Sequence, residues 1–469
     1  MVSFIAYDLV FLVLCTLAVV IFLYKKKHNL QRQGLLYLYR TKVGIRFIEW
    51  TSTKFPKTLW ALQYVILVSG FSLMIGMVYF LTKFSVFYIT SPTAAQALKV
   101  PVIIPLVPYL PEIFNLDFLP PFYFTYWIII IAIIAIPHEF AHGIFARLNK
   151  IKIHSTGFGF LGPFLAAFVE PDEKTLEKRS KFAQMSVLAA GTFANVVFTI
   201  IFGLIFWLFF VSAFSPAGVL FNSYATNVVP IDSINYVNGN LINDASEISG
   251  FVGDENFTEI IANGASFFVP PKTLVSSVEN GLMYVPAYLD SPAFKFNLKG
   301  AITALDGVPV RNFDELRSVL ANYKGGDKVI ISTIVDDKEI IDTELRLAEL
   351  DGKSFLGIGI SPFEREGIMG RIFNLITKIK DPYVYYESSL GNFGWFIYNL
   401  LWWIVLINIS VALVNMLPLG IFDGGRFFML AVWGLTGSKN IGMKAFKIST
   451  WAILLLIVAL MIKWLLIFV

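Results

Sequence analysis

Two histidines and a glutamate within one short stretch could do chemistry together. Residues 138–142 read His-Glu-Phe-Ala-His, which is the H-E-x-x-H pattern. On a helix, residues i and i+4 leave the same face one turn apart, so the imidazoles of His138 and His142 can reach one metal ion. This spacing is typical of a zinc site in which Glu139 stands beside the ion as general base. The stretch therefore predicts one catalytic Zn²⁺.

The setting of this motif is apolar. It ends a long hydrophobic run, residues 122–136, which is long enough to begin a membrane span. Two imidazoles and a carboxylate inside such a segment are costly unless they are paired or bound to metal, so they indicate a functional site. A chance match to the pattern is common on exposed helices of soluble proteins. In an apolar run it is much rarer, because each polar residue there needs a compensating partner.

The composition places the chain among membrane proteins. Of its 469 residues, 56% are hydrophobic and only 15% are charged, against about 25% charged in soluble globular proteins. The net charge of +4 is small, and the basic residues cluster beside apolar runs, which favours topology marking and argues against nucleic-acid binding. Cys15 is the single cysteine, so an intramolecular disulfide and a cysteine-based zinc site are excluded. His28 and His154 lie in basic stretches and are expected to be solvated.

The hydrophobic runs predict a mainly α, polytopic membrane protein. Six spans are expected, at about 4–24, 58–82, 121–148, 183–214, 394–417 and 448–469. Basic residues follow the first span and the third, which places those ends in the cytoplasm. Glu139 precedes Arg147 by eight residues, which puts it roughly 12 Å from the cytoplasmic end of its helix. The proline-rich stretch 83–120 is expected to be an external connection at the membrane surface.

An apolar stretch broken by glycine and proline follows the third span. Residues 157–171 are too short to cross a bilayer, and irregular backbone is tolerated at membrane depth only against protein or a water-filled cavity. We interpret them as a re-entrant β-hairpin that faces the metal site. An ordinary interfacial loop is the alternative.

A catalytic zinc site needs a third protein ligand and an open position for water. Asp423 is the best candidate, because it lies in a break at the inner end of the fifth span, at the depth inferred for His138. The alternative is that it caps the following helix. With Glu139 as proton carrier, the implied reaction is peptide hydrolysis. Asn415, close to Asp423, is a candidate for active-site contact, whereas Asn195 could instead be an amide that packs helices together.

The chain divides by composition into four parts. Residues 1–120 hold the first helices and their connections, and 121–214 hold the zinc motif, the hairpin and the next helix. Residues 215–365 are rich in charges, turns and strand-like runs, and they predict an inserted β-rich domain outside the cytoplasm. Residues 366–469 complete the membrane core with Asp423 and the last span.

Three elements together resemble the site-2 protease family of intramembrane zinc metalloproteases. They are His138 to His142 in one span, Gly191-x-x-x-Asn195 in the next, and Asn415-x-x-Pro418 with Asp423-Gly424 in a later one. The resemblance implies His138, His142 and Asp423 as zinc ligands and Glu139 as the catalytic base. It also implies substrate contacts at Asn415 and Asn195, and pairing of the hairpin, including Gly157 and Gly159, with an unwound substrate segment.

Within the insert, residues 285–360 resemble a PDZ domain. The resemblance rests on Ser291-Pro292-Ala293, on Gly300 to Val310 with its Asp306-Gly307 turn, and on Gly325-Gly326-Asp327 before a strand. Such domains bind peptide ends by adding a strand to a sheet edge. Residues 219–284 depart from the pattern and could be a degenerate second copy, a split part of the same domain or an unrelated elaboration.

We therefore expect a multi-pass protein of the cell membrane that cleaves transmembrane segments of membrane-anchored proteins near their cytoplasmic side. Its expected partners are these substrates, the lipid bilayer and, at the insert, peptide ends or periplasmic or extracellular segments; no nucleic acid is expected. Two alternatives remain: a transporter or channel with histidine and aspartate along an ion path, and a metal-binding scaffold without activity.

Overall fold

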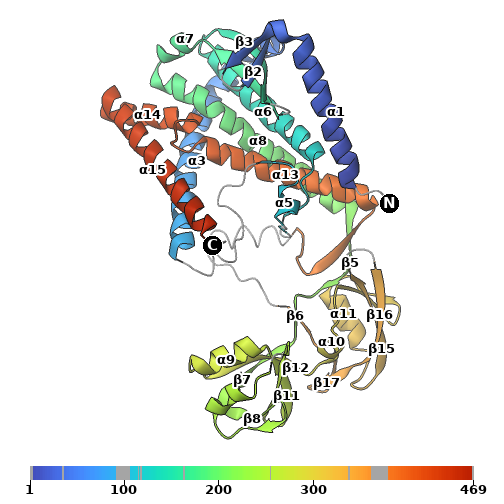
Figure 1. Ribbon diagram of the computed structural model, residues 1–469. Coiled ribbons are helices and arrows are strands. Elements are labelled where there is room, and N and C mark those ends of the chain that lie inside the picture. Colours follow the sequence, from blue (N-terminus) through green and yellow to red (C-terminus); the bar gives the residue numbers. More distant parts are fainter. Residues whose placement is uncertain are drawn as a thin grey trace. The chain divides into compact units, whose positions relative to one another are not determined.

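The computed structural model describes residues 4–33, 36–90, 106–114, 116, 119–161, 164–253, 255–335, 339–360 and 379–466. The chain forms two compact units (Figure 1). The helical unit comprises residues 1–209 and 395–469, and the insert unit comprises residues 210–394. Each is described by itself.

Six helices in the described chain are long and apolar enough to cross a membrane, which confirms the predicted number of spans. They are α1 (Phe4–Lys25), α3 (Pro56–Thr90), α6 (Phe124–Leu148), α8 (Lys181–Ala213), α13 (Gly391–Asn415) and α15 (Lys439–Leu465). In a bilayer a helix satisfies every backbone group internally, so long apolar runs adopt this form. Large hydrophobic side chains remain exposed along these helices, as on α1 and α3, which is the surface that a lipid environment favours.

Shorter helices join the spans of the helical unit. They are α2 (Ile45–Lys54), α5 (Leu110–Ile113), α7 (Glu173–Glu177), α14 (Asp423–Thr436) and the 3₁₀ turn η1 (Lys27–Asn29). Of the predicted external connection 83–120, residues 91–105, 115 and 117–118 lie outside the described part, and residues 83–90 continue α3 as helix.

The predicted hairpin is an antiparallel pair within a larger sheet. Strands β3 (Ile153–Leu161) and β4 (Phe164–Pro171) pair with each other, and β2 (Leu36–Thr41) and β1 (Leu30–Gln33) extend the sheet in the order β1-β2-β3-β4. Residues 162–163, between the two strands, lie outside the described part. The order leaves β4 at one edge of the sheet and β3 paired on both sides. Whether the hairpin enters the membrane remains a prediction.

The N-terminus of α6 is capped by a carboxylate from another span. Asp8 of α1 is 2% exposed, and it accepts hydrogen bonds from the backbone N–H groups of Phe124 and Thr125 at 2.7 and 3.0 Å and from the Tyr109 hydroxyl at 2.6 Å. The first N–H groups of a helix have no partner within it, and they carry partial positive charge. A buried aspartate is therefore compensated here, and it ties α1 to the helix of the zinc motif.

At the C-terminus of α3 a lysine caps the helix. The ammonium group of Lys463, on α15, donates to the carbonyl oxygens of Tyr88 and Ile89 at 2.7 and 2.8 Å. These are carbonyls of the last turn of α3, where a helix carries partial negative charge. The two helix ends thus bind side chains of opposite sign.

The insert unit contains two main sheets, each with its own buried core. The first has the order β7-β12-β11-β10-β8-β9, and the second has the order β16-β15-β13-β5-β20, with β14 paired to β13. The strands of the first sheet are β7 (Thr226–Pro230), β8 (Ile234–Val237), β9 (Asn240–Leu241), β10 (Thr258–Ala262), β11 (Ala265–Val269) and β12 (Tyr284–Leu289). Those of the second are β5 (Phe214–Leu220), β13 (Ala301–Leu305), β14 (Val308–Pro309), β15 (Lys328–Val335), β16 (Glu339–Arg346) and β20 (Val384–Ser388).

Small elements complete the insert unit. The short strand pairs are β6 (Ser223–Tyr224) with β19 (Ile358–Gly359) and β17 (Ala348–Leu350) with β18 (Lys353–Phe355). The helical segments are η2 (Ile231–Ser233), η3 (Ala245–Gly250), α9 (Pro271–Glu279), α10 (Pro292–Lys295) and α11 (Phe313–Leu320).

The two sheets repeat one sequence of elements. In the first, β8 turns into β9, a 3₁₀ segment follows, and β10 pairs with β11; in the second, β13 turns into β14, α11 follows, and β15 pairs with β16. Both turns have two residues with positive φ, Asn238-Gly239 and Asp306-Gly307, the conformation that two-residue hairpins of this kind require. The two sheets therefore share one element order, and the assignment of residues 219–284 to a degenerate second copy, a split part of one domain or an unrelated elaboration stays a prediction.

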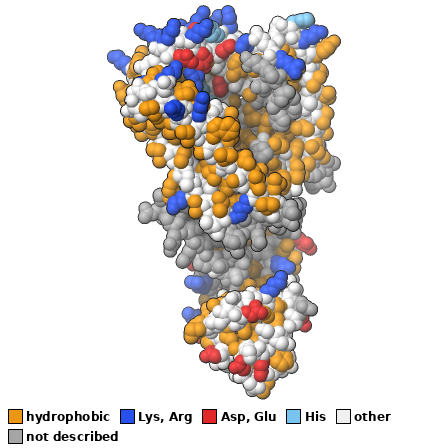
Figure 2. Space-filling view, turned by 60° about the vertical axis from the view of Figure 1, so that its left-hand side comes forward, with side chains coloured by type: hydrophobic (Ala, Val, Ile, Leu, Met, Phe, Trp, Pro, Cys, Tyr) orange, Lys and Arg blue, Asp and Glu red, His pale blue; other side chains and the backbone are white. Residues whose placement is uncertain are grey.

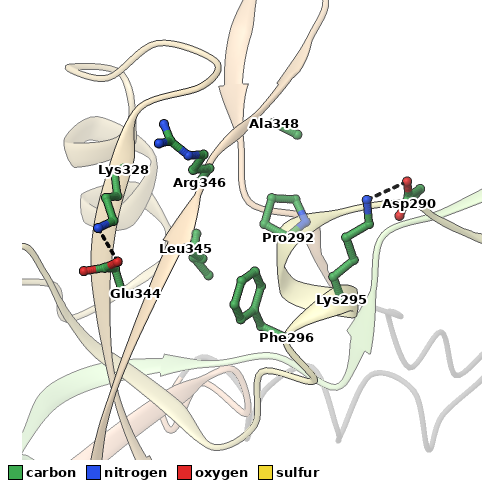
Figure 3. Close-up of a pocket in the computed structure, with 9 residues that line it drawn as sticks. All are labelled: Asp290, Pro292, Lys295, Phe296, Lys328, Glu344, Leu345, Arg346 and Ala348. Atoms are coloured by element: carbon green, nitrogen blue, oxygen red, sulfur yellow. Dashed lines mark ion pairs between the residues drawn. The ribbon is translucent and has the colours of Figure 1, made fainter.

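A cavity of about 450 Å³ opens beside β16 in the insert unit (Figure 3). Four of its charged side chains form ion pairs, Lys328 with Glu344 and Lys295 with Asp290 at 2.8 Å. The remaining cation, Arg346, donates to the carbonyl oxygen of Gly326 at 3.1 Å. Figure 3 shows Pro292, Leu345 and Phe296 between these two ion pairs. The cavity is therefore lined by apolar side chains between the two ion pairs.

Candidate metal centre

The two histidines of α6 project from the same face. His138 and His142 are one turn apart, and their Nε2 atoms lie 3.1 Å from each other. Both side chains are largely buried, with 10% and 13% of their surfaces exposed. The helix therefore places two imidazole nitrogens at one point, as the spacing predicts.

Asp423 reaches the same point from the other end of the chain. Its Oδ2 atom lies 3.6 Å from His138 Nε2 and 3.3 Å from His142 Nε2. Asp423 is the first residue of α14, and the N-cap position of this helix is occupied by Phe422.

Two glycines make the turn before α14 close enough to present Asp423. A Cβ on Gly424 would lie 2.4 Å from the backbone of Met416, and one on Gly425 would lie 2.4 Å from the carbonyl oxygen of Leu419. Such separations are well inside van der Waals contact, so the chain folds back here only with glycine. This explains why the aspartate is followed by Gly-Gly.

Hydrogen bonds at the far nitrogens orient both rings. His142 Nδ1 lies 2.7 Å from the carbonyl oxygen of Val187, which can only accept, so Nδ1 carries the proton and the lone pair of Nε2 faces Asp423. His138 Nδ1 lies 3.1 Å from the amide nitrogen Nδ2 of the fully buried Asn195, whose Oδ1 has no hydrogen-bond partner among the described residues. Turning that amide over lets Oδ1 accept from Nδ1–H and gives His138 the same tautomer.

Gly191 leaves the space in which an ion would sit. A Cβ at this position would lie 2.4 Å from His142 Nε2 and 2.6 Å from His138 Nε2. Helix α8 can therefore approach the two metal-facing nitrogens only through a residue without a side chain. Two nitrogens and a carboxylate oxygen within 4.8 Å of one another suit zinc, and this is the one such group among the residues that the structure describes.

Glu139 is held by the sheet. Its Oε2 atom accepts a hydrogen bond of 2.9 Å from the backbone N–H of Val169 in β4. Val169 also approaches α6 at Gly143, where an added Cβ would lie 3.2 Å from its side chain. The strand at the edge of the sheet therefore packs against the motif helix and fixes one carboxylate oxygen of the predicted base.

The remaining predicted site residues, Asn415, Gly157 and Gly159, lie on α13 and β3. Asn415 is the last residue of α13 and directly precedes the turn to Asp423. Gly157 and Gly159 lie in β3, where Gly157 pairs with Arg40 and Phe168 on its two sides. A Cβ on Gly157 would lie 2.2 Å from the carbonyl oxygen of Tyr39, so packing between strands accounts for this glycine. The edge strands of this sheet are β1 and β4, so Gly157 and Gly159 do not lie at an edge.

The sequence analysis did not predict three groups that hold the metal centre or its helix in place. The Val187 carbonyl and the Val169 N–H are backbone groups, which any residue provides. Asp8 does have a signal, because an acidic residue in an apolar span indicates a partner by the same reasoning as His138. Of the other histidines, His154 lies 3.6 Å from the Asp172 carboxylate, and His28 is exposed, so neither joins the centre.

Comparison with protein-family models matches Peptidase family M50 over residues 126–460, which is most of the chain and includes both halves of the metal centre. The chain belongs to Peptidase family M50. This is the site-2 protease family, and membership confirms the resemblance seen in the sequence. The six apolar helices and the M50 match together indicate an integral membrane metallopeptidase, and its His-His-Asp group could hold a metal. A comparison with curated proteins found no match.

Proposed function

We propose that this M50 member is a zinc metallopeptidase that hydrolyses peptide bonds within transmembrane segments of membrane-anchored proteins. The convergence of His138 Nε2, His142 Nε2 and Asp423 Oδ2 from two distant parts of the chain supports this proposal most directly. The donor set and its orientation fit zinc, and α8 presents no side chain in that space. A zinc ion held there would supply Lewis-acid polarisation of the scissile carbonyl.

The side chains divide the remaining work. The Val187 carbonyl and the Asn195 amide hold the protons of the two imidazoles on Nδ1, which keeps both Nε2 atoms available as ligands. Glu139 takes a proton from the attacking water and transfers it to the leaving amine. Its bond to the Val169 N–H restricts the carboxylate to one orientation while it does so.

A substrate strand would add at β4. Backbone groups of an extended segment can pair with a sheet edge, and β4 is the edge strand whose Val169 contacts Glu139. A peptide unwound there would lie beside the proposed base. We place Asn415 at the opposite side of this segment as a backbone contact, and the PDZ-like insert as a site for peptide ends or extracytoplasmic segments.

The proposed orientation puts the metal centre nearer the cytoplasm. Figure 2 shows Lys and Arg side chains gathered at the end of the helical unit that carries α7 and β3 in Figure 1, above a surface that is largely hydrophobic. Basic residues at one end of a bundle mark the cytoplasmic side. The protein would then lie in a cell membrane, with its insert outside the cytoplasm.

The deciding experiment uses the full-length protein in detergent with a single-span substrate. Wild type should cleave it, whereas Glu139→Gln and wild type with a zinc chelator should not. Glutamine can still accept from the Val169 N–H, so this variant keeps the contact to β4. Glu177→Gln, at an exposed position on α7, is the matched control and should retain activity. Equal cleavage by all samples would contradict the proposal, and zinc binding without cleavage in wild type would indicate the inert scaffold.

A further inference from the structure

The short helix α2 packs directly on the helix of the zinc motif. Ile48 of α2 is fully buried, and its Cδ1 atom lies where a Cβ on Gly143 would be 2.8 Å away. The Phe47 ring contacts the ring of Phe140, with 5.8 Å between centroids, and Phe140 stands inside the H-E-x-x-H stretch. A ligand bound to α2 would therefore act on a helix that packs directly against α6, which carries His138 and His142.

Part of the surface of α2 is exposed, and this part is both aromatic and basic. Phe47 and Trp50 are 53% and 52% exposed, and Val43, just before the helix, is 75% exposed. The cations Lys42, Arg46, Lys54 and Lys57 are also exposed. Positions 46, 50 and 54 of α2 follow the spacing of one helical face, so Trp50 shares a surface with Arg46 and Lys54. Lys42 and Lys57 lie in the segments just before and just after this helix.

The surface carries almost no negative charge. Glu49 is the one acidic residue between positions 42 and 60, and its carboxylate is paired with Arg147 of α6 at 3.1 Å. The four cations therefore meet no acid of their own segment that is free to neutralise them. A ligand with negative charge and an adjoining apolar part would match this face.

The place of α2 in the chain selects the ligand. It ends at Lys54, and the span α3 begins at Pro56, so α2 lies where a membrane helix begins. Aromatic rings favour the headgroup level of a bilayer, and basic groups beside a span attract anionic lipids. We propose that the exposed face of α2 binds anionic lipid headgroups, with Phe47 and Trp50 in the interface and the four cations at the phosphates.

The proposal rests on the membrane setting of the proposed function but does not depend on peptide hydrolysis. It can be tested with the Glu139→Gln protein as well as with wild type. The full chain is reconstituted in phosphatidylcholine bilayers that contain an equal mole fraction of brominated phosphatidylglycerol or brominated phosphatidylcholine. Because the chain has ten tryptophans, the quenching at Trp50 is taken as the difference from Trp50→Phe.

We expect brominated phosphatidylglycerol to quench Trp50 about twofold more than brominated phosphatidylcholine, and the excess to decrease with salt. Combined substitution K42Q, R46Q, K54Q and K57Q should remove the excess. The matched variant K174Q, K178Q, K444Q and K447Q makes the same charge change at exposed positions elsewhere in the helical unit and should retain it.

Three results would overturn the proposal. Equal quenching by both lipids would show that the face touches the bilayer without preference for charge. Absence of Trp50 quenching by either lipid would show that the face is not in contact with lipid. An excess that survives the substitution of Lys42, Arg46, Lys54 and Lys57 would show that other residues hold the headgroups.

Discussion

Buried polar side chains have different meanings in the helical unit and in the insert unit. In the helical unit Asp8, His138 and Asn195 are buried within spans, and each contacts a particular group on another element. In the insert unit the ion pairs are exposed, as with Lys328 and Glu344, and the buried cores are mostly aliphatic, with only hydroxyl side chains such as Thr258 and Ser291 among the buried polar groups of its described residues. A polar residue in an apolar span has no water as an alternative partner, so its partner identifies its role.

The two units also reach stability differently. Strands of the insert bury alternate residues, as β10 does from Thr258 to Ala262, because a sheet with one packed face requires period two. The spans expose large hydrophobic side chains outward and use small residues and polar contacts between helices. Substitution of one polar or small residue should therefore have large, specific effects in the helical unit and small effects in the insert.

The largest effect is expected for Gly191→Ala. Its Cβ would lie 2.4 Å from His142 Nε2, in the space of the ion, so bound zinc should be lost when measured by elemental analysis of the purified protein. Gly203→Ala on the same helix is the control, because a Cβ there meets nothing within 4 Å. Full zinc content in Gly191→Ala would show that α8 does not border the metal.

Asn195→Leu tests the orienting bond to His138. Loss of an outer partner of a ligating histidine weakens metal binding about 10- to 100-fold, which a competition titration with a chelator would measure. Asn195→Asp should largely restore affinity, since a carboxylate accepts from Nδ1–H as the turned amide does. If leucine binds zinc as tightly as asparagine, the residue serves helix packing alone.

Asp8→Ala removes the cap of α6 without touching the metal centre. Hydrogen bonds to a charged group contribute about 1.5–3 kcal/mol each, so a loss of at least about 2 kcal/mol in the free energy of unfolding is expected, together with a lower melting temperature in detergent. Thr16→Val on the same helix removes only a local bond to Leu12 and is the control. Equal stability of both variants would contradict the cap.

The smallest effect is expected for Glu344→Gln in the insert. It breaks the pair with Lys328, but both side chains are 56% exposed, and such pairs contribute about 0–1 kcal/mol. Hydrogen exchange of the backbone along β15 and β16 in the full chain would measure the change. A loss as large as that for Asp8→Ala would show that the two units do not differ in this respect.

The sequence by itself determined the spans, the three residues that could hold a metal and the class of chemistry. Long apolar runs and the i, i+4 spacing of His138 and His142 are local properties, so they can be read without neighbours. Asp423 could be predicted as well, because a carboxylate in a broken span requires a partner at its own depth.

Only the tertiary structure decided what surrounds these residues. The sheet that joins β2 to β3, the N–H of Val169 at Glu139 and the carbonyl of Val187 at His142 are contacts of backbone groups distant in the chain. Every residue type offers such groups, so composition does not distinguish the one that pairs. The residues of the metal centre can therefore be predicted from the sequence. The orientation of each ring and carboxylate depends on how the chain packs.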